Sequence, residues 1–116
     1  MTRNSVASVV SGYAESHAGQ RGIGAYNWLV CLLQAHPGST STAVSHGSSS
    51  AVVTVVDGAV VLHSLSGEAA DSAVLLMHAR DAYGADTALR GLALPGDRQT
   101  KNLFEEAGLP AQVLVH

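Results

Sequence analysis

Apolar side chains recur every three or four positions in two stretches near the N-terminus, which is the spacing of a helix with one buried face. The first stretch, residues 4–17, aligns four such side chains: Val6, Val9, Val10 and Tyr13. The second, residues 25–36, aligns a longer set: Trp28, Leu29, Leu32, Leu33 and His36. Pro37 and Gly38 then interrupt the pattern, because neither residue continues a helix well. The sequence therefore predicts two helices before any strand.

The middle of the chain changes to apolar runs rich in β-branched residues. Residues 51–56 and 59–65 are joined by Asp57-Gly58, a pair that favours the type I′ turn of a β-hairpin. Apolar residues occupy consecutive positions in both runs, so we expect strands covered on both faces, in the centre of a sheet. The preceding segment, residues 37–50, is rich in Ser, Thr and Gly and is interpreted as a loop with a short strand around residues 42–45.

The second half of the chain predicts two more helices, each followed by a strand. Residues 68–83 have a helical pattern with acidic side chains in the first turn, where they favour the helix dipole. Residues 98–107 form a shorter helix that Asp97 caps. The apolar segments 87–94 and 112–115 are interpreted as strands.

The predicted order is ααβββαβαβ, within one domain over residues 1–116. An antiparallel hairpin followed by parallel β-α-β units gives a mixed sheet. Helices must then cover both of its faces, because its central strands are apolar throughout. We therefore expect an α/β fold, with the helices arranged around a mixed sheet.

Composition limits the partners of the chain. Charged residues make up 13% of the sequence, about half the usual share, and this leaves apolar surface for contact with another chain, most simply in a homodimer. The formal net charge is −3 and the six basic residues form no run, which argues against nucleic-acid binding. No apolar stretch is long enough for a membrane span, so we expect no membrane contact and a cytoplasmic location.

The single cysteine and the apolar stripe around it are assigned to the core. Cys31 has no partner for an internal disulfide and is interpreted as a small buried hydrophobic residue. The apolar stripe over residues 26–33 could be a partner surface, but packing against the sheet is the favoured interpretation.

Two stretches resemble the GCN5-related N-acetyltransferase family. Residues 60–71, VVLHSLSGEAAD, pass from a strand through a Ser/Gly turn into a helix, and residues 103–109, LFEEAGL, are similar to the family signature LYEKLGF. The order of elements also resembles the family fold without its first strand, as in some very short members. The resemblance implies a fold built for acetyl-coenzyme A.

In that family the helix after the fourth strand binds the pyrophosphate of acetyl-coenzyme A at its N-terminus, through a Gln/Arg-x-x-Gly-x-Gly/Ala pattern. The resemblance therefore implies five cofactor-binding residues: Ser64, Ser66, Gly67, Ala69 and Ala70. Ser64 replaces the long polar residue of the pattern, and the charge of Glu68 opposes a diphosphate. The alternative is an ordinary helix start in which Ser66 satisfies the free backbone donors as a cap.

The family's general acid has no direct equivalent in this sequence. Phe104 stands where the family has a tyrosine that protonates the leaving thiolate, and phenylalanine cannot donate a proton. The resemblance leaves that role to Tyr83, His63 or a water molecule. His63 also lies in the region from which family members recruit a general base, although a buried core histidine is the alternative. His63 and Tyr83 are thus the catalytic candidates.

Two functions follow from these features. Small size, Phe104 and Glu68 favour a non-catalytic binding, inhibitory or scaffold module with a protein partner, of the type that phages and mobile elements encode. The alternative is an acetyl-coenzyme A-dependent N-acyltransferase. A hydrolase at residues 45–50, SHGSSS, lacks the G-x-S-x-G pattern, and the six histidines show no metal-binding spacing.

Overall fold

The computed structural model describes residues 5–84, 88–95, 97–109 and 111–113, and they form the nine elements expected from the sequence. In chain order the elements are α1 (Val6–Ser16), α2 (Ile23–Ala35), β1 (Thr40–His46), β2 (Ser49–Val56), β3 (Ala59–Ser66), α3 (Ala69–Tyr83), β4 (Ala88–Ala93), α4 (Arg98–Glu106) and β5 (Ala111–Val113). The predicted α/β order ααβββαβαβ is confirmed. The last two residues of the predicted strand 112–115 lie outside the described residues.

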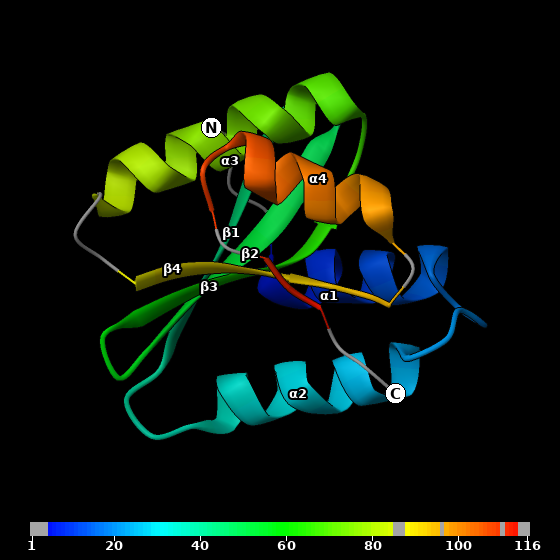
Figure 1. The fold of residues 1–116 in the computed structure, drawn as a ribbon. Helices are drawn as coiled ribbons and strands as arrows, with labels where there is room; N and C mark the ends of the chain where they lie inside the picture. The colour runs from blue at the N-terminus through cyan, green and yellow to red at the C-terminus, as the bar shows by residue number, and fades with distance from the viewer. Residues whose placement is uncertain (1–4, 85–87, 96, 110, 114–116) are drawn as a thin grey trace.

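The five strands form one mixed sheet in the order β1-β2-β3-β4-β5. The first two pairs are antiparallel, whereas β3 with β4 and β4 with β5 are parallel, as the hairpin and the β-α-β units predict. Helices α3 and α4 cover one face of the sheet, and α1 and α2 cover the other (Figure 1). The expected mixed sheet with helices on both faces is thus confirmed.

The central hairpin forms at the predicted turn. Asp57 and Gly58 have φ angles of 50° and 80°, as a type I′ turn requires, and Val56 pairs with Ala59 on either side of it. The two strands of this hairpin occupy interior positions of the sheet. Alternate side chains of β3 enter different layers, because Val60 packs beneath α3 and α4 whereas Val61 packs beneath α1 and α2.

The interpretation of residues 37–50 as mainly a loop is wrong. Seven of these residues form β1, which pairs with β2 along its whole length. The inward positions of β1 include Ala43 and Ser45, which are buried but are too small or too polar to produce a hydrophobic alternation. A strand whose buried face carries such residues gives little signal in the sequence.

The interpretation of Cys31 as a buried residue is also wrong, and that of the apolar stripe as core is only partly correct. Tyr26 and Val30 are buried against the sheet, but Cys31 is exposed and the side chains of Trp28 and Leu32 are 66% and 46% exposed. Because α2 is apolar on nearly every side, its periodicity cannot indicate which face turns inward.

Candidate functional site

Strands β3 and β4 separate near their C-terminal ends. Their pairing begins at Ala59 and ends at Leu62, which lies opposite Gly91. Just beyond this point β3 contains an extra residue relative to β2, and Ser64 adopts a φ of 57°, a left-handed conformation that is rare for a residue with a side chain. A bulge of this kind turns the strand and ends its pairing, so the sheet opens here.

A cleft of about 470 Å³ lies at the opening. Three segments form its walls: the end of α1 with the following loop, the junction of β3 and α3, and the first turns of α4. The lining residues are mostly polar: Ser16, His17, Gln20, Leu65, Ser66, Gly67, Ser72, Asp97, Gln99, Thr100 and Leu103. Clefts beyond the carboxyl ends of parallel strands are common ligand sites in α/β proteins.

The start of α3 is held by the turn between β1 and β2. The backbone N–H of Glu68 donates to Ser48 Oγ at 3.0 Å, and Ser48 donates both its backbone N–H and its hydroxyl to Asp71 Oδ2 at 2.8 Å. The expectation that Ser66 caps this helix is therefore wrong. Glu68 is the N-cap residue and makes no side-chain capping bond of its own.

Gly67 allows this turn to approach closely. Its φ is 112°, and a Cβ at this position would lie 2.5 Å from both Ser48 O and Ser49 Cα. The lack of a side chain at Gly67 thus serves contact between two parts of the backbone. The resemblance would have a phosphate approach the Gly67 backbone closely, but the β1–β2 turn occupies that space.

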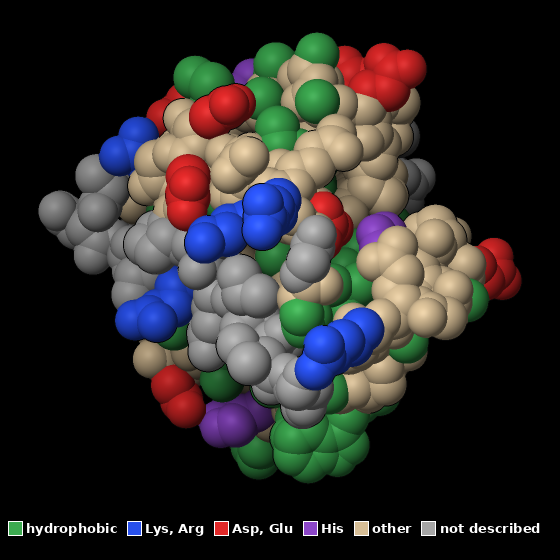
Figure 2. All heavy atoms as spheres, turned by 45° about the vertical axis from the view of Figure 1, so that its right-hand side comes forward, with side chains coloured by type: hydrophobic (Ala, Val, Ile, Leu, Met, Phe, Trp, Pro, Cys, Tyr) green, Lys and Arg blue, Asp and Glu red, His purple; other side chains and the backbone are tan. Residues whose placement is uncertain are grey.

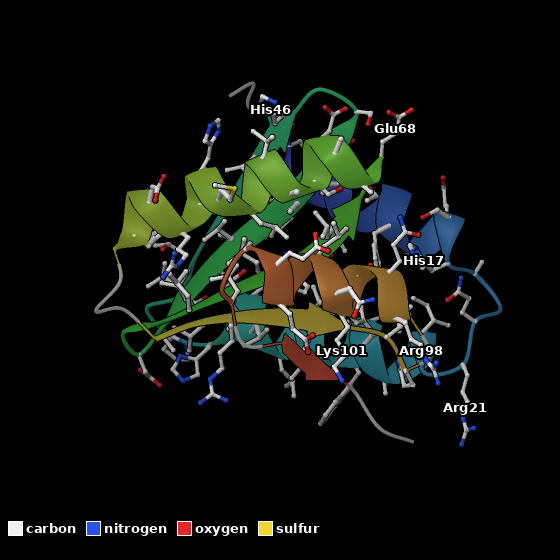
Figure 3. All side chains as sticks on the ribbon, turned by 45° about the horizontal axis from the view of Figure 1, so that its top comes forward. His17, Arg21, His46, Glu68, Arg98 and Lys101 are labelled. Carbon is white, nitrogen blue, oxygen red and sulfur yellow. The ribbon has the colours of Figure 1, made fainter. Side chains whose placement is uncertain are left out.

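The charges around the cleft do not favour an anion. Among the described residues that line it, none is lysine or arginine, and its ionisable members are His17 and Asp97. Figure 3 shows Glu68 at the start of α3 and His17 beside the start of α4, with Arg98 on the side of α4 away from α3. Hydrogen bonds from Ser48 lower the pKa of Asp71, so the carboxylate in the first turn of α3 favours its ionised form, one turn from Glu68 at the N-cap.

His17 and Asp97 face one another across the cleft. Their Nε2 and Oδ2 atoms are 4.0 Å apart, and both side chains are about one-sixth exposed, at 17% and 16%. The carboxylate of Asp97 caps α4 as predicted, since it accepts the backbone N–H of Thr100 at 3.2 Å and its hydroxyl at 2.8 Å. The imidazole of His17 stacks on Tyr13 with 4.0 Å between ring centroids. Both groups are thus fixed in position.

The catalytic candidate His63 lies inside the protein, beneath α1 and α2. It is fully buried, and its two ring nitrogens hydrogen-bond to Thr54 Oγ1 at 2.8 Å and to Ser64 Oγ at 3.1 Å. Burial lowers the pKa of His63 to about 4, because the interior disfavours the charged ring. His63 does not line the cleft.

The cofactor candidate Ser64 belongs to the same buried network. Its backbone N–H, released from the sheet by the bulge, donates to the hydroxyl of Tyr26 on α2. Burial is the main reason that the pKa of Tyr26 is raised to about 12, while the hydrogen bond from Ser64 opposes that shift. This network ties the bulge of β3 to the helix that covers it.

Neither Tyr83, the second catalytic candidate, nor Phe104, at the position that the resemblance gives to a tyrosine, lines the cleft. Tyr83 lies in the last turn of α3, whereas the cleft is at the first, and a helix of 15 residues separates its ends by about 20 Å. Phe104 is completely buried, and its ring lies so close to Gly91 that a Cβ there would be 2.3 Å from it. Phe104 therefore fills the core beside β4.

Of the five residues assigned to a cofactor, Ser66 and Gly67 line the cleft, Ser64 is buried, and Ala69 and Ala70 are exposed in the first turn of α3. Sequence reasoning missed the contribution of α1 and its following loop. The helix-cap pattern predicted the role of Asp97, but no local sequence pattern connects Asp97 with His17, which lies 80 positions earlier in the chain.

The described residues contain no cluster of three or more His, Cys, Asp or Glu side chains that could hold a metal ion. Within the same residues, no helix has the length and apolar character needed to cross a membrane.

Comparisons of the chain with protein-family models, with curated proteins and with solved structures find no match.

Proposed function

We propose that this protein is a small non-catalytic binding module with a GCN5-related N-acetyltransferase-like fold, and that it holds its ligand in the cleft at the open end of β3 and β4. The resemblance supports the fold family through the segments 60–71 and 103–109. The cleft supports a binding role, because it is concave, mostly polar and built on secondary structure that is already in place.

The observation that carries this proposal is the position of the groups that acyl transfer would need. His63 has both ring nitrogens engaged in the interior, and Phe104 is buried where the family presents a tyrosine hydroxyl. Tyr83 lies at the far end of α3 from the cleft. A proton acceptor or donor must be within hydrogen-bond reach of its substrate, and these three residues do not line the cleft.

The start of α3 also suits a diphosphate poorly. Its Glu68 N–H is bonded to Ser48, and the carboxylates of Glu68 at the N-cap and of Asp71 in the first turn add negative charge there. Like charges at such a site repel by about 1 kcal/mol or more near a protein surface. The module therefore takes a neutral or positively charged ligand.

An acetyl-coenzyme A-dependent N-acyltransferase is the second candidate. The observation in its favour is that the cleft opens between β3 and β4 and is lined by Ser66 and Gly67, two of the five residues that the resemblance assigns to the cofactor. Incubation with acetyl-coenzyme A and a mixture of primary amines, read by mass spectrometry, tests it. Acetylated products that require the protein would support this candidate against the binding module.

Nuclear magnetic resonance tests the binding module. N-methylacetamide, a neutral mimic of a peptide bond, is titrated into labelled protein, and we expect amide shifts at Ser66, Gly67 and Thr100. A Ser66→Trp substitution should fill the cleft and abolish these shifts, whereas Ser8→Trp on the exposed side of α1 should leave them unchanged. Shifts that are spread over the surface, or that persist in Ser66→Trp, contradict a binding cleft.

We also propose that α2 pairs with α2 of a second copy. The 13 residues of α2 include no charged side chain, and Trp28, Cys31 and Leu32 are exposed along it. Figure 2 shows hydrophobic side chains gathered at the bottom of the molecule, the side on which Figure 1 places α2.

The two ends of α2 differ in charge. Arg21 lies just before the helix, whereas Asp57 contacts His36 just after it, with 3.3 Å between Asp57 Oδ2 and His36 Nε2. An antiparallel pair of α2 helices related by a two-fold axis brings the arginine end of each copy to the aspartate end of the other. This complementarity favours a second copy as the occupant of the α2 face.

A further inference from the structure

We infer that His17 and Asp97 recognise a protonated amine in the cleft. This inference rests on the proposed binding function of the cleft and adds the chemical class of its ligand. It follows from the hydrogen-bonding state of the two side chains and from the gap between them.

The hydrogen bonds of His17 determine which of its nitrogens carries the proton. Nδ1 lies 2.9 Å from the carbonyl oxygen of Tyr13 and 2.9 Å from Ser16 Oγ, and that hydroxyl donates to the same carbonyl at 3.0 Å. A carbonyl oxygen can only accept, so in the neutral ring Nδ1 must be the donor. Nε2, on the side of Asp97, is then left as a bare acceptor.

Two acceptors consequently face each other in the cleft. Nε2 of His17 and Oδ2 of Asp97 are 4.0 Å apart, too far for a direct hydrogen bond. For a donor nitrogen about 2.8 Å from each acceptor, the angle at the nitrogen between the two acceptors would be roughly 90°. An ammonium group, whose hydrogens spread at nearly tetrahedral angles, can donate one hydrogen to each acceptor.

Charge and rigidity favour an ammonium over a neutral donor. The Asp97 carboxylate is held by two bonds from Thr100, and its negative charge adds to burial, which is the main cause of the raised pKa values of Tyr13 and Tyr26. Stacking on Tyr13 fixes the His17 ring. The cleft thus presents a carboxylate and an imidazole acceptor that are already oriented, with no lysine or arginine among its described lining residues to compete.

Three probes of equal length test this inference by nuclear magnetic resonance titration at low salt and about pH 8, where an ordinary imidazole is neutral. They are n-propylammonium, 1-propanol and propionate. We expect n-propylammonium to bind in the cleft about tenfold more tightly than 1-propanol, and propionate to bind most weakly.

Two variants separate the charge from the acceptor. Asp97→Asn keeps a side chain that caps α4 but removes the charge, and His17→Phe keeps the ring on Tyr13 but removes Nε2. Each should weaken n-propylammonium binding about tenfold and reduce its preference over 1-propanol. Their circular dichroism and unfolding curves should show that both variants are folded.

The outcomes distinguish this inference from the proposed function. If N-methylacetamide shifts the cleft resonances but n-propylammonium binds no better than 1-propanol, or if both variants keep the preference, the amine inference is wrong and the binding cleft stands. If neither N-methylacetamide nor n-propylammonium shifts the cleft resonances, both are wrong.

Discussion

Ser48 Oγ accepts the backbone N–H of Glu68 at 3.0 Å, so the turn between β1 and β2 caps the start of α3 across 20 positions of sequence. The same hydroxyl donates to Asp71 in the first turn of that helix. One serine therefore supplies both the acceptor that a helix start needs and a donor to its acidic residue. This contact fixes one wall of the cleft and occupies the site at which the resemblance places a pyrophosphate.

Removing this hydroxyl should loosen α3. We expect Ser48→Ala to lower the free energy of unfolding by about 1 kcal/mol, the usual cost of losing a helix cap. Urea denaturation measures the change. Ser11→Ala, on the exposed side of α1, is the control and should stay within about 0.5 kcal/mol of the unmodified protein. Equal stability of the two variants would show that Ser48 does not cap α3.

Gly67 should not tolerate a side chain, whatever ligand the cleft binds. A Cβ there would lie 2.5 Å from Ser48 O, and the φ of 112° is unfavourable for any other residue. Gly67→Ala should lower the free energy of unfolding by about 2 kcal/mol or more. Gly12→Ala, at an open position within α1, should instead stabilise the protein by about 0.5–1 kcal/mol. Thermal unfolding of both variants gives the comparison, and a loss of similar size at both positions would contradict this account.

The buried His63 should make stability fall in acid. Its pKa in the folded protein is about 4, below its ordinary value of 6.5, so between these values the unfolded chain binds a proton that the folded chain does not. The free energy of unfolding should therefore decrease as the pH falls from 6.5 to 4, by up to about 3 kcal/mol. The contribution is fully present above pH 6.5.

His63→Gln is the control for this acid dependence. It should be less stable at neutral pH, because Thr54 and Ser64 lose their partner, but it should lack the decrease caused by the imidazole. Urea denaturation at a series of pH values measures both proteins. If the free energy of unfolding changes with pH in the same way in both proteins, His63 is protonated as readily in the folded state as in the unfolded chain.

The α2 face should associate two copies. We expect sedimentation to show a dimer at about tens of micromolar, and a mild oxidant to link Cys31 to Cys31 between copies. Trp28→Glu should give a monomer, since it places like charges next to the two-fold axis. Cys31→Ser should remain a dimer without the covalent link. A monomeric unmodified protein at that concentration would disprove this use of α2.

Local patterns explain why much of the fold could be predicted. The Asp57-Gly58 turn, the apolar runs on either side of it and the Asp97 cap are each encoded within a few residues. They define the central hairpin, the start of α4 and, with the helix spacing, the order of elements. Strand β1 was predicted only as a short strand around residues 42–45, because the small residues on its buried side, Ala43 and Ser45, produce no apolar period.

The cleft could be predicted only in part, because its residues meet through tertiary structure. The β3–α3 junction was recognised from its Ser/Gly turn, and Ser66 and Gly67 do line the cleft. The hydrogen bond from Glu68 to Ser48 and the facing of His17 and Asp97 join segments that are distant in sequence and carry no shared local pattern. The bulge that buries Ser64 likewise depends on pairing with β2.

Calorimetric titration with acetyl-coenzyme A, using the unmodified protein and Glu68→Gln, is the most direct test of the central claim that the cleft is a binding site unsuited to this cofactor. We predict no saturable heat with either protein, because Ser48 keeps the Glu68 backbone donor in both. Glu68→Gln should only lower stability slightly, through the loss of a favourable charge near the helix start. Binding by the unmodified protein at low micromolar affinity, roughly −8 kcal/mol, that tightens in Glu68→Gln would contradict the account and identify a diphosphate site.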